Sequence, residues 1–307
     1  MKKDEEIKKE NIDTVIPAEK NESHGEVKKK VGGYELVRKV MMCLFGAMFL
    51  VFMVITVMFM IRNVNANKSN ENIMEDFNQI TNPGTLPDNN DPVVADPEES
   101  TGNTQTPEDD AYAAYVAECI AEAKKLKSQY PDFRAVIIIE GDTINLKYPV
   151  FQTTDNKYYV EHLVDGSKNT AGELFLDYRN KGDILENRNT TIYGHNMNNG
   201  TKFGQLHKYK KNNAFYTHNI TIVTTEAVLT FKPFSFYKTD IYNNYTLGVF
   251  SNDAAFAEFC RSEQERSMFK SDIEFTGKET IITLSTCYGT SKTERYCLHA
   301  VLVNIAK

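Results

Sequence analysis

The chain has 307 residues, of which 41% are hydrophobic and 25% charged, and this composition is typical of a folded protein rather than a disordered or collagen-like one. Its formal net charge of −7 disfavours a general nucleic-acid-binding protein, because such proteins use a basic surface to displace counterions from phosphate. Five cysteines without any Cys-x-x-Cys pair argue against a zinc ribbon, an iron–sulfur protein or a small disulfide-rich fold.

An uncharged apolar run occupies residues 40–61. As a helix rising about 1.5 Å per residue, this run spans a hydrocarbon core about 30 Å thick. A cleaved signal peptide would be shorter and closer to the N-terminus, and a buried core helix would carry a polar stripe. We therefore predict an uncleaved transmembrane anchor at residues 40–61, with membrane lipid around it.

Basic residues flank this run unequally. Those before it are Lys28, Lys29, Lys30, Arg38 and Lys39, and those shortly after it are Arg62 and Lys68. Because basic flanks stay preferentially in the cytoplasm, we predict a single-pass protein with a disordered cytoplasmic tail at residues 1–39. Everything after the anchor is then extracellular.

Residues 62–106 contain many acidic residues and prolines and few apolar residues. Such a composition buries too little apolar surface to offset the entropy cost of ordering the chain. We therefore predict an extracellular linker over residues 62–106, which holds a folded domain, residues 107–307, away from the membrane.

The folded domain is predicted to begin with a helix. Thr106 is a suitable N-cap and Pro107 suits the first helical position. The apolar face that follows, with spacings of three and four, consists of Val116, Cys119, Ile120, Ala123 and Leu126. Pro131 ends this helix.

Short β-rich runs separated by turn residues make up most of the remaining sequence. We predict strands at residues 135–139, 148–151, 157–160, 173–176, 191–193, 220–224, 228–231, 234–238, 246–250, 280–284 and 296–305. One clear helical stretch interrupts them, at residues 253–267. A helix followed by strands without regular βαβ alternation favours a mainly β fold, a closed or nearly closed β-barrel with added helices.

Three residues form a candidate catalytic set. Cys287 ends the β-rich run TIITLSTC, and His195 ends the run beginning at Thr191, so each can face a cleft from the end of a strand. A thiolate can attack a carbonyl while an imidazolium delivers a proton to the leaving amine. Arg295 opens the last strand, and a hairpin would return its guanidinium beside the thiol, where it could stabilise an oxyanion.

The other histidines and cysteines are expected to have structural roles. These residues are His162, His207, His218, Cys43, Cys119, Cys260 and Cys297. His299 is the main alternative to His195, because it alternates onto the same strand face as Arg295. Whether any of the cysteines pair in a disulfide stays open at this point.

The ordered motifs of this chain resemble those of the sortases, the cysteine transpeptidases of Gram-positive cell surfaces. The resemblance covers residues 111–307 and rests on the N-terminal anchor, Tyr193-Gly194-His195-Asn196, Leu284-Ser285-Thr286-Cys287 and Arg295. Class B is the most similar, from the segments TLSTC, GHNM with Phe203 and Leu206, YPVFQTTDNKYYVEH and GELFLDYRN. The chain departs from class B at Tyr130-Pro131-Asp132-Phe133, where members often have Asn-Pro-Asp-Val and a tryptophan.

This resemblance implies a sortase-like barrel of about eight strands and a role for each candidate. Cys287 would be the nucleophile, His195 the general acid and Arg295 the residue that orients the substrate or stabilises the oxyanion. Four further residues, adjacent to the catalytic ones, would line the substrate cleft: Tyr193, Asn196, Ser285 and Thr286. The implied chemistry needs no metal and no cofactor.

The resemblance also implies the partners. The substrates would be secreted surface proteins with a C-terminal sorting signal, cleaved after a threonine through a thioester on Cys287. For class B the signal is of the asparagine-proline-x-threonine type. An amine of a peptidoglycan precursor or of a pilin lysine would resolve the thioester, and the residues do not distinguish these two acceptors.

Two other readings stay open. Another cysteine enzyme acting on the cell wall, such as an L,D-transpeptidase or a papain-like hydrolase, would share the location and the nucleophile. However, the papain order places the histidine after the cysteine, whereas His195 precedes Cys287. In a non-enzymatic anchored surface domain, Cys287 would simply belong to the core.

Overall fold

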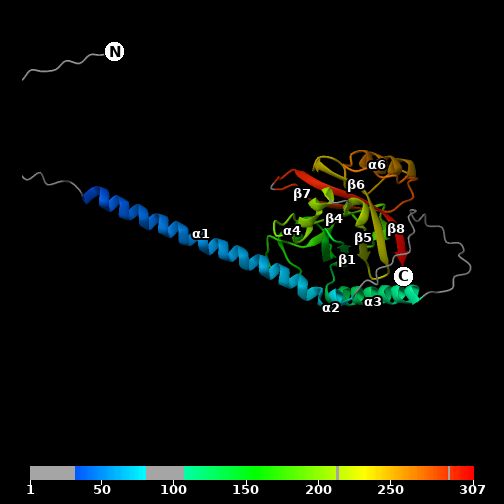
Figure 1. Cartoon of the computed structure of the whole chain (residues 1–307), viewed down its shortest axis with the longest axis horizontal. Coiled ribbons are helices and arrows are strands. Elements are labelled where there is room, and N and C mark those ends of the chain that lie inside the picture. Colours follow the sequence, from blue (N-terminus) through cyan, green and yellow to red (C-terminus); the bar gives the residue numbers. More distant parts are fainter. Residues whose placement is uncertain (1–31, 81–106, 212–213, 290) are drawn as a thin grey trace, which may run out of the picture. The chain divides into compact units, whose positions relative to one another are not determined.

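The computed structural model describes residues 32–80, 107–211, 214–289 and 291–307. The chain divides into two compact units, Met1–Ile55 and Thr56–Lys307. In its described part, the first unit consists of the beginning of helix α1 (Gly32–Ile73), and the second contains the end of α1 and all other elements (Figure 1).

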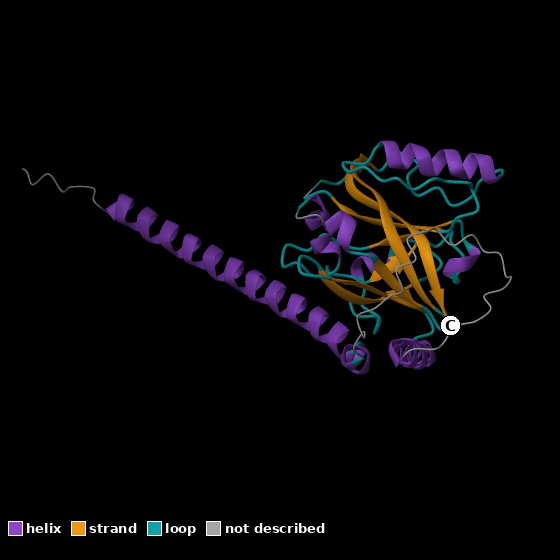
Figure 2. Ribbon diagram, turned by 45° about the vertical axis from the view of Figure 1, so that its right-hand side comes forward, coloured by secondary structure: helices purple, strands orange, loops and turns teal. Residues whose placement is uncertain are grey.

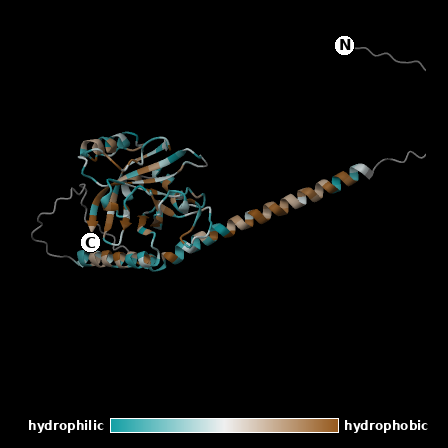
Figure 3. Ribbon diagram, turned by 180° about the vertical axis from the view of Figure 1, so that it is seen from behind, coloured by the Kyte–Doolittle hydropathy of each residue, from teal (hydrophilic) through white to brown (hydrophobic). Residues whose placement is uncertain are grey.

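Helix α1 contains the predicted anchor. Within the described residues it is the one helix long and apolar enough to cross a membrane, judged by length and composition. Figure 3 shows that much of α1 is hydrophobic. The apolar side chains between residues 40 and 61 are largely exposed, as expected if lipid covers them. Helix α1 begins at Gly32, so residues 32–39 are helical and differ from the predicted disordered tail, whose residues 1–31 lie outside the described residues.

The structure also differs from the predicted linker over residues 62–80. Helix α1 continues to Ile73, and α2 (Glu75–Gln79) follows it. The side chains that these helices bury are Ala66, Asn70, Ile73, Met74, Phe77 and Ile80. Most of them recur at spacings of three and four, which is one face of a helix. The linker prediction missed this apolar face because it used the average composition of residues 62–106, which is acidic. Residues 81–106 lie outside the described residues.

Helix α3 (Pro107–Gln129) confirms the helix predicted before Pro131. The predicted apolar face is buried at Val116, Cys119, Ala123 and Leu126 and packs on one side of the barrel. The expected N-cap, Thr106, lies outside the described residues.

Within the described residues, eight strands close into the predicted barrel, in the order β1-β2-β3-β4-β7-β8-β6-β5 (Figure 2). The strands are β1 (Phe133–Glu140), β2 (Asn145–Phe151), β3 (Leu174–Leu176), β4 (Asn189–Tyr193), β5 (Ile220–Val223), β6 (Val228–Asp240), β7 (Ile281–Cys287) and β8 (Glu294–Ala306). The pairs β2–β3 and β4–β7 are parallel, and all other neighbours are antiparallel.

The register between β4, β7 and β8 decides which side chains face the core. Ile192, Leu284 and Leu298 lie side by side and point into the barrel. Because side chains alternate along a strand, their neighbours Tyr193 and Ser285 point to the opposite face. Polar and reactive residues of these strands are therefore collected on the outer face of an apolar core.

Two strand predictions were wrong, and two predicted strands form one continuous strand. Residues 157–160 lie mainly in helix α4 (Tyr158–Glu161), because the Asp155 carboxylate accepts hydrogen bonds from the backbone N–H groups of residues 157 and 158 and starts a helical turn. Residues 246–250 form no strand and follow a turn closed by Leu247 N–H and Asn244 O. The runs 228–231 and 234–238 form the single strand β6, with an irregularity in its pairing near Pro233.

Helix α6 (Asp253–Glu265) confirms the helix predicted before the cysteine strand. Its N-cap is Asn252, whose side chain accepts a hydrogen bond from Ala255 N–H. The helix packs through Phe256 and Cys260 against the outer face of β6, β7 and β8. Besides α2 and α4, the short helices that were not predicted are η1 (Ile184–Glu186), η2 (Phe203–Lys210) and α5 (Ala214–Thr217).

Candidate active site

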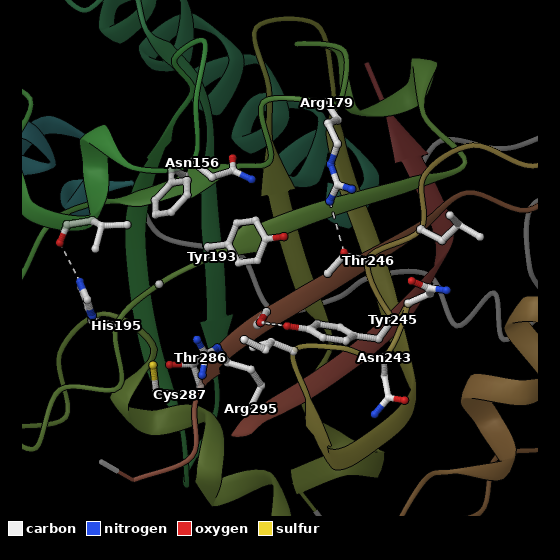
Figure 4. Close-up of a pocket in the computed structure, with 17 residues that line it drawn as sticks. Asn156, Arg179, Tyr193, His195, Asn243, Tyr245, Thr246, Thr286, Cys287 and Arg295 are labelled. Carbon is white, nitrogen blue, oxygen red and sulfur yellow. Dashed lines mark hydrogen bonds between the residues drawn. The ribbon is translucent and has the colours of Figure 1, made fainter. Parts of the chain in front are cut away.

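A pocket of about 560 Å³ opens on the outer face of β4 and β7 and is lined by all three candidate catalytic residues (Figure 4). Strands β4, β7 and β8 contribute its floor, α4 contributes Val160, and residues 241–247 after β6 form a wall. Cys287 and His195 lie toward one end, and Asn243 lies toward the other. An extended peptide chain could lie along this pocket with one carbonyl at the thiol.

Cys287 is the last residue of β7 and the half-buried, free thiol of the pocket. Its backbone pairs with Arg295 of β8, whereas the pairing of β7 with β4 ends at Ser285. Asn196 donates a hydrogen bond of 2.9 Å from its side chain to the Cys287 carbonyl. Both interactions fix the backbone of the candidate nucleophile and leave its side chain in the pocket.

His195 follows β4 directly, and its Nε2 lies 2.7 Å from the carbonyl oxygen of Val160 in α4. Because a carbonyl only accepts, Nε2 carries the hydrogen and donates it, which fixes the orientation of the ring. Gly194 brings the chain to this position, since a Cβ there would lie 2.2 Å from a methyl carbon of Leu174. A larger residue at position 194 would therefore have to displace the buried side chain of Leu174.

Arg295 lies opposite Cys287 in the pairing of β7 with β8. Its Nη1 donates hydrogen bonds to the carbonyl oxygens of Lys292 and Glu294, at 3.1 and 2.9 Å. The Glu294 carboxylate pairs with Lys238 instead, and Arg295 forms no ion pair within the described residues. Its positive charge is therefore available to a substrate carbonyl in the pocket.

Of the four further residues predicted to line the cleft, Tyr193, Ser285 and Thr286 do so and Asn196 does not. The hydroxyl of Ser285 lies 3.0 Å from that of Tyr245, a residue of the opposite wall. The Thr286 hydroxyl is buried and lacks a hydrogen-bond partner among the described residues. Asn196 instead supports the site through its bond to Cys287.

The buried Asp177 connects two lining residues of the pocket, Tyr193 and Arg179. The Tyr193 hydroxyl donates to Asp177 at 2.9 Å, and Arg179 pairs with the same carboxylate at 2.6 Å. Burial acts to raise the pKa of Asp177, but the hydrogen bonds from Arg179 and Tyr193 outweigh it and hold the pKa below its ordinary value. Burial and Asp177 together raise the pKa of Tyr193, so its hydroxyl stays protonated.

Sequence reasoning missed the wall at residues 241–247 and the role of Val160. Thr246 and Leu247 lie within the strand that was wrongly predicted at residues 246–250, and no motif marks them or Tyr245. Burial raises the pKa of Tyr245 to about 12. The side chain of Asn189, buried in β4, supports this wall through a 3.0 Å hydrogen bond to the Leu247 carbonyl. Such contacts join residues far apart in the chain and leave no local signal.

The alternative histidine, His299, is fully buried and does not line the pocket. Its Nδ1 lies 2.9 Å from the Thr283 hydroxyl, and its Nε2 lies 3.1 Å from the Cys297 sulfur. Burial raises the pKa of the Cys297 thiol well above its usual value. All five cysteines are free, and Cys119, Cys260 and Cys297 are buried. His299 therefore belongs to a packed structural cluster.

No group of three His, Cys, Asp or Glu side chains that could hold a metal ion lies within the described residues. The pocket offers one thiol, one imidazole and two guanidinium groups, those of Arg179 and Arg295, and this set suits nucleophilic acyl transfer.

Comparison with known proteins matches residues 139–303 to the family model described as the sortase domain. Sortase B of Listeria monocytogenes is 32% identical over 200 residues, which are 60% of this chain and 78% of that protein. A mutant form of Clostridium perfringens sortase B has a similar structure, with a TM-score of 0.56, 29% identity and coverage of 61% of this chain and 89% of the other. A Staphylococcus aureus sortase B–substrate complex has a TM-score of 0.54 and 29% identity, covering 60% and 85%.

Proposed function

This chain belongs to the sortase family, is a class B sortase and therefore a cysteine transpeptidase, and we propose that Cys287, His195 and Arg295 carry out its reaction. The observation that carries this assignment is that three residues from separate strand ends line one pocket, with Cys287 and Arg295 opposite each other in the sheet. The histidine-before-cysteine order also disfavours a papain-like hydrolase.

In the first half-reaction, the Cys287 sulfur attacks the carbonyl carbon of a threonine in the sorting signal. The negative charge that develops on the carbonyl oxygen is stabilised by the Arg295 guanidinium, which has no carboxylate partner among the described residues. The peptide C–N bond then breaks, His195 gives a proton to the leaving amine, and a thioester remains on Cys287. His195 must be protonated for this step.

In the second half-reaction, an amine attacks the thioester carbonyl, His195, left neutral by the first half-reaction, takes a proton from this amine, and the Cys287 thiolate leaves. The product is a new amide bond between the surface protein and its acceptor. The acceptor is either an amine of a peptidoglycan precursor of the cell wall or the amine of a pilin lysine. The substrate signal is of the asparagine-proline-x-threonine type, in keeping with the class B membership of the chain.

The proposed topology places residues 1–39 in the cytoplasm, an anchor at residues 40–61 in the membrane and the catalytic domain, 107–307, outside the cell. The apolar surface of α1 and the excess of basic residues before residue 40 support this orientation. Residues 62–80 pack with the folded part and therefore do not act as the predicted linker, and residues 81–106 lie outside the described residues.

Trapping of the thioester tests the proposal. The full chain is incubated with a panel of sorting peptides that differ at one position each, quenched in acid and digested, and the peptide containing Cys287 is examined by mass spectrometry. We expect a mass increase equal to the peptide up to its threonine, on Cys287 alone. An adduct on another cysteine, or cleavage without any adduct on Cys287, would contradict the assignment.

A further inference from the structure

The helical segment at residues 62–80 packs against the part of the domain that surrounds α4. Ala66 is fully buried and forms a small apolar cluster with Leu163 and Ala171, against which Met197 also packs. The side chain of Asn169 donates a 2.8 Å hydrogen bond to the carbonyl of Arg62. All of these residues belong to the unit Thr56–Lys307, so the contact lies within one compact body.

The far end of the same segment has a second attachment. Ile73, Met74, Phe77 and Ile80 join the apolar cluster between α3 and the outer face of the barrel. Asp76 pairs with Lys125 of α3 at the surface. The segment is therefore held at both ends, which limits its freedom to slide or rotate on the domain.

Backbone hydrogen bonds connect the first contact to α4, whose Val160 carbonyl holds His195. Asn169 N–H bonds to the Glu161 carbonyl at 2.8 Å, and Glu173 N–H bonds to the Tyr159 carbonyl at 2.9 Å. Gly172 lies so close that a Cβ there would be 2.2 Å from the Tyr159 carbonyl oxygen. The segment 169–173 thus sets the position of α4, and Ala171 within this segment packs in the same cluster as Ala66.

A buried ion pair connects the same region to the loop after His195. Glu173 pairs with Lys202, and both side chains are almost completely buried. Lys202 lies opposite Asn196 in an isolated bridge, and Phe203 N–H bonds to the His195 carbonyl at 3.0 Å. His195 is therefore held from two sides, by the Val160 carbonyl of α4 and by the loop that contains Lys202. The ion pair with Glu173 connects this loop to the segment that contacts α4.

We propose that residues 62–80, the helical continuation of the predicted anchor, are a positioning element for His195. The segment supports α4 through Ala66 and Asn169, and α4 fixes the imidazole through the Val160 carbonyl. This inference rests on the proposed role of His195 as the general acid. The chain that leaves the membrane would thereby belong to the support of the catalytic site.

Replacing Ala66 with glutamate tests this proposal, with Val64→Glu as the matched control. Both changes add the same charge two residues apart on one helix, but Ala66 is fully buried and Val64 is 62% exposed. The full chain is reconstituted in lipid nanodiscs, and kcat and KM for one sorting peptide are measured from pH 5 to pH 9. A thermal unfolding curve gives the folded fraction of each variant at the assay temperature.

We expect Ala66→Glu to lower kcat by about tenfold to a hundredfold with KM within about threefold, since small displacements of a catalytic group cost this much. The pH profile of kcat/KM should also shift, because the hydrogen bond that orients His195 is disturbed. A merely structural role would lower the folded fraction without moving this profile. Val64→Glu should match the wild type in all three quantities.

Asn169→Asp provides a second variant, in case Ala66→Glu fails to fold. It keeps the oxygen that accepts from Ala171 N–H but removes the donor to the Arg62 carbonyl. We expect Asn169→Asp to lower kcat less than Ala66→Glu does, and to shift the pH profile of kcat/KM in the same way. Folded variants that behave like Val64→Glu overturn the proposal. If His195→Ala is itself fully active, the proposed role of His195 fails instead, so the two failures are distinguishable.

Discussion

Arg295 lies directly opposite Cys287 across the antiparallel pair of β7 and β8, and it forms no ion pair within the described residues. The adjacent carboxylate, Glu294, is taken by Lys238, whose ammonium also lies 4.0 Å from the ring centre of Tyr288. Tyr288 directly follows the thiol residue. Lys238 thus holds the hairpin and takes the adjacent carboxylate, so the Arg295 guanidinium bonds to backbone carbonyls and to no carboxylate among the described residues.

Arg295→Lys should remain strongly impaired. A planar guanidinium donates two parallel hydrogen bonds, whereas lysine offers a single charge on a flexible stem. Loss of an oxyanion donor typically costs about 2.7 to 4 kcal/mol, or about a hundredfold to a thousandfold in rate. The measurement is kcat/KM for wild type, Arg295→Lys and Arg295→Ala on one sorting peptide. A lysine variant within threefold of the wild type would refute the geometric role.

Cys287 should be the reactive thiol of the folded domain. In a Cys43→Ser background, a methanethiosulfonate reagent should label Cys287 rapidly, whereas Cys119, Cys260 and Cys297 should react only after unfolding, because they are buried. Burial also raises the pKa of Cys119 to about 11, which keeps it protonated at neutral pH. Peptide mapping identifies the labelled residue.

Cys287→Ala should abolish peptide cleavage while leaving the thermal midpoint close to that of the wild type. The half-buried side chain contributes little packing at the edge of the pocket. Cys297→Ala is the control, since it removes a buried thiol from the neighbouring strand and should affect stability more than rate. Residual turnover above a few per cent in Cys287→Ala would remove this residue as the nucleophile.

His195→Ala should lower kcat by about a hundredfold to ten-thousandfold, the usual contribution of general acid catalysis. His207 is a suitable control, because it bonds to the Gly204 carbonyl and does not line the pocket. Steady-state kinetics of both alanine variants on the same peptide provide the comparison. Equal, small effects in the two variants would mean that His195 does not supply the proton.

Asp177 should make stability depend on acid pH. Its pKa is held low in the folded state, so its stabilising contribution is complete above the unfolded value of about 3.9 and disappears as the pH falls through the folded value. Asp177→Asn should cost about 1 to 3 kcal/mol at pH 7, since it weakens hydrogen bonds to a charged group. The cost should decrease at lower pH.

Thermal or urea unfolding of wild type and Asp177→Asn between pH 7 and pH 2.5 measures this difference. Asp183→Asn is a control. Asp183 is exposed, and asparagine can still accept the hydrogen bond that Leu185 N–H donates to it. A constant difference between wild type and Asp177→Asn across the whole range would mean that the Asp177 charge contributes no stability.

Much of the fold can be predicted from local pattern. Short β-rich runs bounded by turn residues identify β1, β4, β7 and β8. Proline and spacing identify α3, and an apolar run identifies the membrane-crossing candidate within α1. Residues 157–160 escape this reasoning because their apolar composition fits a strand, whereas a capping carboxylate at Asp155 starts a helix.

The sequence by itself determined the candidates for the reaction: Cys287, His195 and Arg295 each stand at a strand end within a recognisable motif. The tertiary structure alone decided their surroundings. The Val160 carbonyl that orients His195, the wall at residues 241–247 and the packing of Ala66 on Leu163 all join segments far apart in the chain. Local patterns report which face of an element is apolar, but the partner of that face follows only from the register of the closed barrel and from the packing on its surface.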